Sequence, residues 1–325
     1  MNESLVSVDI RLPSNWADEE MRADIRRAFS NTPVVLPPKW LYDHNGSEIF
    51  SEITRLAEYY PTEAERQLLQ EHADEIAETT QADTVVELGS GTSDKTRTLL
   101  DAFAATGRLK KFGPVDVSEE TLLAAAEDLN ERYPDVKISA LVGDFTRHLP
   151  HLPTGDKRLV AFLGGTIGNL YVEERRAFLG ALADVLKPGE WLLLGFDPLK
   201  DVDKILAAYN DAAGLTDRFV RNVLSVINGK LGATFDPSGF EYIPFWDGCE
   251  GRVDMRLRAS IPQRVRIEHL DLEVDFGEGE EIRVEISSKF HPENLRDEID
   301  AADFAVRKTY LAPGDEFGLL LAERV

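Results

Sequence analysis

Short apolar runs alternate with longer segments of helical periodicity from residue 83 onward. Runs of five or six residues that are rich in Val, Leu and Phe are typical of strands buried in a parallel sheet, and the longer segments fit crossover helices. The expected strands are residues 84–88, 113–117, 137–142, 158–163 and 191–196. The pattern therefore predicts an α/β fold built on a mostly parallel sheet.

Helix signals stand between these runs. Ser118 has the chemistry of an N-cap and is followed by helical periodicity over residues 121–129. The sequence Lys187-Pro188-Gly189 is a helix stop. The expected helices are residues 93–105, 121–129 and 172–186.

The rhythm changes after residue 197. Two helical stretches, 202–213 and 217–228, precede strand-like alternation over 240–290, and the apolar run 316–323 could return to the sheet as its last strand. We therefore expect a discontinuous main domain, a smaller α+β domain inserted into it and a separate N-terminal segment. The expected ranges are 30–199 with 290–325, 200–289, and 1–29.

Composition limits the partners. A net charge of −23 over 325 residues repels a phosphate backbone, which argues against DNA and RNA. A single cysteine, Cys249, excludes an internal disulfide, and the sequence has neither a signal peptide nor a run of about 20 apolar residues. We expect a cytoplasmic monomer with a small-molecule substrate and no nucleic-acid or membrane partner.

Candidate chemistry begins where the first core strand ends. Gly89 and Gly91 permit a tight turn and a close approach of the backbone to a ligand, and a helix N-terminus would follow them. Either a nucleotide or S-adenosylmethionine could use this turn. A dinucleotide site needs a third glycine where this chain has Asp94, so pyrophosphate binding is less favoured.

Acidic residues follow the next two strands. Asp116 is placed to accept both hydroxyls of a ribose, and Asp144 could accept an adenine amino group while Phe145 lies against the ring. Together these positions indicate an adenosine site. The alternative interpretation is that both carboxylates cap loops.

This set of motifs resembles the Rossmann-like class I methyltransferases, which use S-adenosylmethionine. The likeness extends to one branch, the histidine-specific Nα-methyltransferases of ergothioneine biosynthesis. It is carried by five segments: residues 36–43 (LPPKWLYD), 53–62 (ITRLAEYYPT), 162–170 (FLGGTIGNL), 208–214 (AYNDAAG) and 270–276 (LDLEVDF). The resemblance implies that the main domain binds S-adenosylmethionine and the smaller domain binds the substrate. It also places Tyr42 and Lys95 near the methionine end of the cofactor.

The resemblance implies an amino-acid site as well. Tyr59, Tyr209 and Asn169 would hold the carboxylate and amino group of the substrate. Phenols and an amide suit this task because they bind a carboxylate without placing a competing nucleophile beside a sulfonium. Gly164, in the same glycine-rich segment as Asn169, is also counted as substrate-binding.

The imidazole is assigned to Glu285 and Ser287, with Met255 at the pocket wall. Strand periodicity supports the pair independently: the apolar residues 282, 284 and 286 would share one face, and Glu285 and Ser287 the other. The alternative is an exposed strand face on which Arg283 and Lys289 are charge partners.

The expected activity is transfer of three methyl groups to the α-nitrogen of free L-histidine, without a metal. Tyr42 is the candidate proton acceptor, and the rings of Tyr42 and Phe50 could face the cationic product. Three alternatives remain open: a methyltransferase for another amino acid such as tryptophan, a nicotinamide-dependent oxidoreductase, and a non-catalytic adenosine-binding module.

Overall fold

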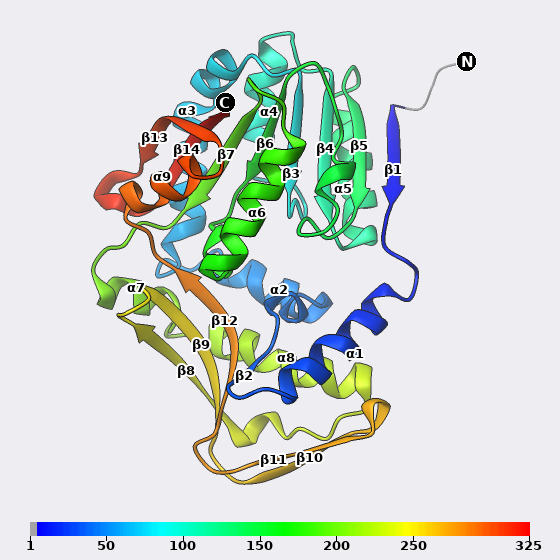
Figure 1. The fold of residues 1–325 in the computed structure, drawn as a ribbon, viewed down its shortest axis with the longest axis vertical. Coiled ribbons are helices and arrows are strands. Elements are labelled where there is room, and N and C mark those ends of the chain that lie inside the picture. The colour runs from blue at the N-terminus through cyan, green and yellow to red at the C-terminus, as the bar shows by residue number, and fades with distance from the viewer. Residues whose placement is uncertain (1–4) are drawn as a thin grey trace. The chain divides into compact units, whose positions relative to one another are not determined.

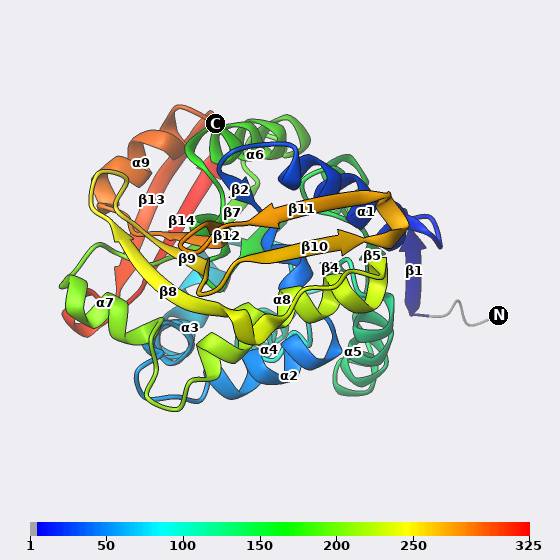
Figure 2. The same cartoon turned by 90° about the horizontal axis from the view of Figure 1, so that it is seen from below.

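The computed structural model describes residues 5–325, which form two compact units (Figures 1 and 2). The first unit comprises residues 5–13, Glu63–Pro198 and Phe290–Val325. The second comprises Ser14–Thr62 and Leu199–Lys289. Within residues 5–325, no helix is both long enough and apolar enough to cross a membrane.

The first unit is built on an eight-stranded sheet. Its first six strands in spatial order pair in parallel, whereas β14 is antiparallel to both of its neighbours, β7 and β13. The spatial order is β1 (Val6–Ile10), β5 (Lys137–Val142), β4 (Lys111–Asp116), β3 (Thr84–Leu88), β6 (Arg158–Phe162), β7 (Trp191–Phe196), β14 (Gly318–Arg324) and β13 (Phe304–Leu311). This is the predicted α/β sheet, with the C-terminal run returning to it.

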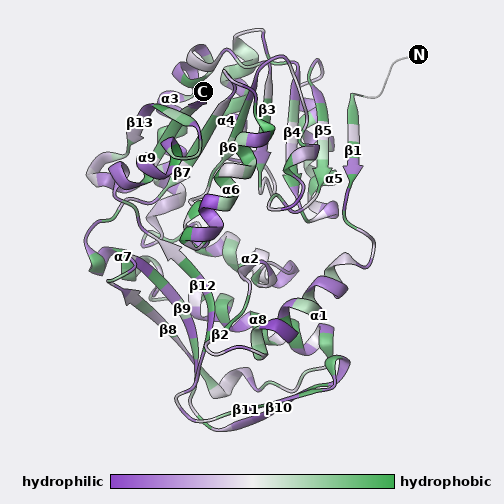
Figure 3. Ribbon diagram, in the orientation of Figure 1, coloured by the Kyte–Doolittle hydropathy of each residue, from purple (hydrophilic) through white to green (hydrophobic). Residues whose placement is uncertain are grey.

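Helices cover both faces of this sheet. Neighbouring residues of a strand point to opposite faces, so each strand contributes side chains to two apolar cores. Val85 and Leu193 lie in one apolar core and Val86 and Leu194 in the other, and Figure 3 shows the matching hydrophobic colour on the central strands. One core includes residues of α3, α4 and α5, and the other includes residues of α6 and α9. These helices are α3 (Tyr60–Thr80), α4 (Thr96–Ala105), α5 (Glu119–Arg132), α6 (Val172–Val185) and α9 (Pro292–Asp300). Ser118 is the N-cap of α5, as predicted.

The second unit combines helices with a small mixed sheet and an antiparallel hairpin. The four-stranded sheet has the order β2 (Val34–Val35), β12 (Glu281–Ser288), β9 (Arg252–Ala259) and β8 (Phe240–Asp247). Only β2 and β12 pair in parallel in it. The hairpin is β10 (Gln263–Ile267) with β11 (Leu272–Phe276). The helices are α1 (Trp16–Phe29), α2 (His44–Ile53), α7 (Val202–Ala208) and α8 (Leu215–Leu231).

The division differs from the expected one in the N-terminal part of the chain. Residues 14–62 cluster with the second unit rather than forming a separate segment and the start of the main domain. The reason is burial: Ile25 of α1 and Ile49 and Ile53 of α2 share one apolar core with Val223 and Leu224 of α8.

One expected helix is shorter than the periodicity indicated. The stretch predicted over 202–213 ends at Ala208, the last residue of α7. Asp211 instead accepts the N–H groups of Leu215 and Thr216 at 2.8 Å each, so it satisfies donors at the start of α8. Part of the segment predicted as helix is therefore a loop that caps α8.

The face assignment on β12 also differs from the simple alternation. A bulge between Arg283 and Glu285 inserts one residue, so that Ile282 pairs with Leu257, Glu285 with Met255 and Ile286 with residue 254. Paired residues share a sheet face. Glu285 and Ser287 therefore do share a face, but Ile282 lies on that face and Ile286 on the other.

Candidate active site

The first unit gathers its predicted ligand residues at one edge of the sheet. Strands β5, β4, β3 and β6 are parallel neighbours, so their carboxyl ends meet at the same edge. Ligands of open α/β sheets bind at this edge, where the strand order reverses beside the first core strand. The residues there are Gly89, Gly91, Lys95, Asp116, Asp144, Phe145, Gly164 and Asn169.

The glycine turn after β3 is held by β4. The N–H groups of Gly89 and Ser90 donate to the Val115 carbonyl at 2.9 and 3.0 Å. Both Gly89 and Gly91 have positive φ, of 68° and 48°, and a Cβ added to either would have no neighbour within 4 Å. The backbone is therefore open to a ligand at both glycines.

Asp116 ties this turn to the next strand. One carboxylate oxygen accepts the Gly91 N–H and the other the Ser118 N–H, both at 3.0 Å. An ionised carboxylate has about four acceptor positions, so two hydroxyls of a ribose can still be accepted. Asp116 is thus positioned by the loops as well as available to a nucleoside.

Asp144 and Phe145 follow β5. Asp144 Oδ1 accepts both the N–H and the hydroxyl of Thr146, at 2.8 and 2.6 Å, which is the loop-capping role of the alternative interpretation. Phe145 packs edge-on against Phe162 and Phe178, with ring centroids 5.1 and 5.9 Å apart. Its half-buried ring is held in place at the sheet edge and can flank a base.

Two buried carboxylates in this unit, Glu87 and Glu65, have no motif in the sequence that indicates a site. Glu87, at the end of β3, accepts the Thr96 hydroxyl, and burial raises its pKa to about 7. Its Oε2 has no hydrogen-bond partner among residues 5–325. The glycine turn, Asp116 and this unmatched buried oxygen fit a cofactor that carries both a ribose and an amino group.

Glu65, on α3, is the second. Its buried carboxylate accepts the Gly164 N–H at 2.6 Å and pairs with the Lys95 ammonium. Glu65 thus holds Lys95 next to Gly164. A glutamate in a charged helix resembles a solvated surface residue, and its position gave no signal of this role.

The second unit brings its predicted residues together around an aromatic group. Tyr42 lies edge-on to Phe50 at 5.4 Å, Phe50 to Tyr59 at 6.1 Å, and Tyr59 to Tyr209 at 6.2 Å, measured between ring centroids. Phe219 of α8 packs against both Tyr42 and Phe50. A chain of aromatic faces suits a cationic group, which is attracted to the negative face of a ring.

Three polar groups lie at the Tyr209 end of this row of aromatic rings. The Tyr209 and Ser287 hydroxyls are 2.7 Å apart, and the Lys289 ammonium donates to each of them at 2.8 Å. Lys289 is only 6% exposed, so it is not the surface charge partner of the alternative interpretation. The sequence around Lys289 gave no signal of a role in the site.

Glu285 lies on the same sheet face as Met255 and Ser287. It is 7% exposed, and burial raises its pKa to about 8, although the charge of Lys289 acts in the opposite direction. Burial disfavours the ionised form of a carboxyl group, and a hydrogen bond from a ligand N–H stabilises that form. Glu285 thus gains from a ligand that brings an N–H donor. Glu285 therefore has the properties expected of an imidazole-reading residue.

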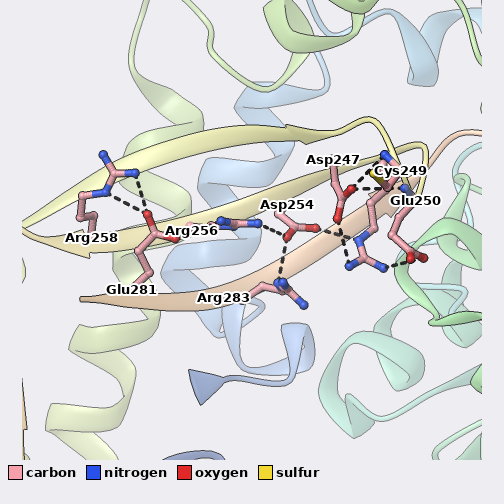
Figure 4. Close-up of polar contacts among 9 residues, drawn as sticks. Asp247, Cys249, Glu250, Asp254, Arg256, Arg258, Glu281 and Arg283 are labelled. Carbon is pink, nitrogen blue, oxygen red and sulfur yellow. Dashed lines mark hydrogen bonds and ion pairs between the residues drawn. The ribbon is translucent and has the colours of Figure 1, made fainter. Parts of the chain in front are cut away.

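The opposite face of the same sheet carries a separate ion network (Figure 4). Asp254, fully buried, pairs with Arg252, Arg256 and Arg283. Arg283 thus faces this network, and its partner is Asp254. Because of the bulge in β12, Glu285 lies on the Met255 face of the sheet and Arg283 on the opposite face with Asp254.

Tyr42 has the wrong electrostatics for a proton acceptor. Its pKa is raised well above the ordinary value, first by burial of the hydroxyl and then by Glu285, Tyr59 and Tyr209. The residue as a whole is 41% exposed, which limits the effect of burial, but the neighbouring acids act in the same direction. A raised pKa favours the neutral phenol over the phenolate that a base requires.

Comparison with known proteins decides the family. The chain matches the family described as "Histidine-specific methyltransferase, SAM-dependent" over residues 21–324. It belongs to this family. The histidine N-alpha-methyltransferase of Mycolicibacterium smegmatis is 48% identical over 96% of this chain and 98% of its own length. The histidine N-alpha-methyltransferase of Mycobacterium tuberculosis is 46% identical over 98% of this chain and 99% of its own length.

A fungal relative extends the comparison. The "Ergothioneine biosynthesis protein 1" of Schizosaccharomyces pombe is 31% identical over 85% of this chain and 37% of its own length. The resemblance identified from the sequence motifs is therefore confirmed at the level of the family, and S-adenosylmethionine is the family's cofactor. The individual roles of the site residues stay predictions.

Proposed function

We propose that this protein transfers three methyl groups from S-adenosylmethionine to the α-amino nitrogen of free L-histidine. The products are the trimethylammonium betaine and S-adenosylhomocysteine, and the betaine serves ergothioneine biosynthesis. Family membership over residues 21–324 and two relatives named for this activity support the proposal. The cytoplasmic location and the monomeric state stay predictions.

The cofactor is assigned to the sheet edge of the first unit. Asp116 would accept the ribose hydroxyls, Asp144 and Phe145 the adenine, and the turn at Gly89 and Gly91 would contact the backbone side of the ligand. When bound, S-adenosylmethionine supplies a methyl group on a sulfonium, an electrophile whose leaving group is a neutral thioether.

The amino acid is assigned to Tyr59, Tyr209 and Asn169 at its carboxylate and amine, and to Glu285 and Ser287 at its ring. These groups bind and orient the substrate, and alignment of reacting atoms removes much of the entropic barrier. The raised pKa of Tyr42 changes one assignment. We propose that Tyr42 contributes its ring to the cationic product, and that the amine gives its proton to water.

The observation that carries the choice of histidine is the buried Glu285 beside Ser287 on one sheet face. Histidine offers two ring nitrogens to an acid and a hydroxyl, whereas tryptophan offers one N–H. A site that pairs buried polar groups with a ligand rejects rings lacking that pattern strongly, because the groups would be left unpaired. Histidine is therefore favoured over the tryptophan alternative.

The experiment is incubation of the protein with labelled S-adenosylmethionine and each free amino acid separately, followed by mass spectrometry. Histidine should gain one, two and three methyl groups. Labelling of tryptophan in place of histidine would replace the proposal with its runner-up. Binding of S-adenosylhomocysteine without turnover of any amino acid would favour the non-catalytic module, and binding of NAD alone the oxidoreductase.

Two site variants test the assigned roles. Tyr59→Phe and Asn169→Ala should each weaken histidine binding while the affinity for S-adenosylhomocysteine stays nearly constant. Histamine, which lacks the carboxylate, should be a poor substrate. Efficient methylation of histamine would show that no carboxylate is held.

A further inference from the structure

Lys289 occupies the centre of the polar groups in the second unit. Its ammonium donates to the Tyr209 and Ser287 hydroxyls, and its Nζ lies 4.7 Å from the centroid of the Tyr209 ring. The side chain is buried directly after β12, and burying an ammonium costs much free energy unless it is hydrogen-bonded. A buried lysine that contacts two assigned ligand groups calls for a functional explanation.

The direction of its hydrogen bonds is fixed by chemistry. An ammonium has three donors and no acceptor, so both hydroxyl oxygens must accept from Lys289. The 2.7 Å contact between the two hydroxyls then uses the proton of one of them. The other O–H is directed away from these three groups, as a donor.

The positive charge strengthens that donor. A hydroxyl that accepts from a cation is polarised and donates more strongly, and the local dielectric of a buried site enhances the effect. If Tyr209 donates outward, Ser287 donates to Tyr209 and keeps a lone pair for a ring N–H. The arrangement then offers a donor for a carboxylate and an acceptor for an imidazole at the same time.

We propose that Lys289 is a positioning residue of the amino-acid site: it orients the Tyr209 and Ser287 hydroxyls and makes the site selective for a substrate that bears a carboxylate. This inference rests on the proposed function and adds a residue to it. Lys289 acts through the two hydroxyls, and its charge compensates the charge of the bound carboxylate.

The test is Lys289→Met, which keeps an unbranched side chain of nearly the same length and removes its charge and donors. The KM for histidine should rise about tenfold or more while kcat changes less, because hydrogen bonds to charged groups are lost from ground and transition states alike. Histamine turnover should fall less than histidine turnover, because histamine shares the ring contact to Ser287 but has no carboxylate to lose. The preference for histidine over histamine should therefore fall.

Lys200→Met is the matched control. Lys200 also lies in the second unit and donates to a tyrosine hydroxyl, that of Tyr60 at 3.3 Å, with Nζ 4.7 Å from the ring centroid. Its loss should leave the KM for histidine unchanged. S-adenosylhomocysteine affinity and the melting temperature, measured for each variant, report whether the fold is intact.

Lys289→Gln keeps an amide donor without the charge, and it should give an intermediate KM even if the methionine variant does not fold. An unchanged histidine KM in either folded variant would overturn the inference, as would an equal loss for histamine and histidine. Failure of the proposed function is distinguishable, because it would appear as absent histidine turnover in the unmodified protein.

Discussion

Glu285 should make the folded protein less stable as the pH rises, and Glu285→Gln should remove this effect. Burial raises the pKa of this carboxyl from 4.5 to about 8 in the folded protein. In the unfolded chain the pKa is near its ordinary value of about 4.3, so the unfolded state ionises first. Below that pH the residue causes no penalty, and the penalty grows until the pH passes 8.

The magnitude follows from the same values. Raising a pKa from 4.5 to about 8 corresponds to about 5 kcal/mol of lost stability at alkaline pH, as an upper limit. Glutamine has nearly the shape of a protonated glutamate and does not ionise. We therefore expect the variant to gain a few kcal/mol relative to the unmodified protein between pH 5 and pH 8.5, while losing histidine turnover.

The assay is urea unfolding at several pH values without ligand, with the free energy of unfolding compared between the two proteins. Glu281→Gln, on the same strand, is the control. Burial would raise the pKa of Glu281, but hydrogen bonds from Arg258 and Arg256 lower it, so its loss should destabilise the fold throughout this range. Parallel pH profiles for the Glu285 variant and the unmodified protein would refute the reasoning.

Three further predictions concern ligand binding. Asp116→Ala should weaken S-adenosylhomocysteine binding by about 1.5–3 kcal/mol in calorimetry, and unchanged affinity would remove Asp116 from the site. Combining Glu285→Ala with Met255→Val should shift kcat/KM from histidine toward tryptophan, because the acid is lost and the pocket wall recedes; a constant ratio across the single and double variants would contradict this. Glu65→Gln should weaken cofactor binding, because the Lys95 ammonium loses its buried partner. Unchanged affinity for S-adenosylhomocysteine in calorimetry would contradict this.

The central sheet was predictable because its strands are buried on both faces. Runs such as residues 84–88 and 191–196 are apolar throughout, and they appear as β3 and β7 with the predicted bounds. The glycine turn and Asp116 could be found for a related reason, since ligand residues follow strand ends in this fold class. Local sequence contains both signals.

Other features depend on contacts between distant parts of the chain. Residues 14–62 contain amphipathic helices whose apolar faces match the core around α8, and periodicity does not say which core a helix joins. Glu65 and Lys289 belong to residue types that are mostly exposed, so only their burial identifies them. The bulge in β12 leaves no mark in an alternating pattern until the partner strand is known.

That bulge gives a single residue of β12 control over what the strand presents to a ligand. Val284 is the extra residue between the pairs Arg283–Arg256 and Glu285–Met255, so deleting it would remove the bulge and leave Glu285 opposite Met255. If Val284 were instead paired in a regular ladder, Val284 would take the place beside Met255 and Glu285 would lie beside the arginines around Asp254. Loss of the bulge without loss of a residue would therefore invert the strand's chemistry while leaving its composition intact, so the bulge itself is a direct target for redesigning ring recognition.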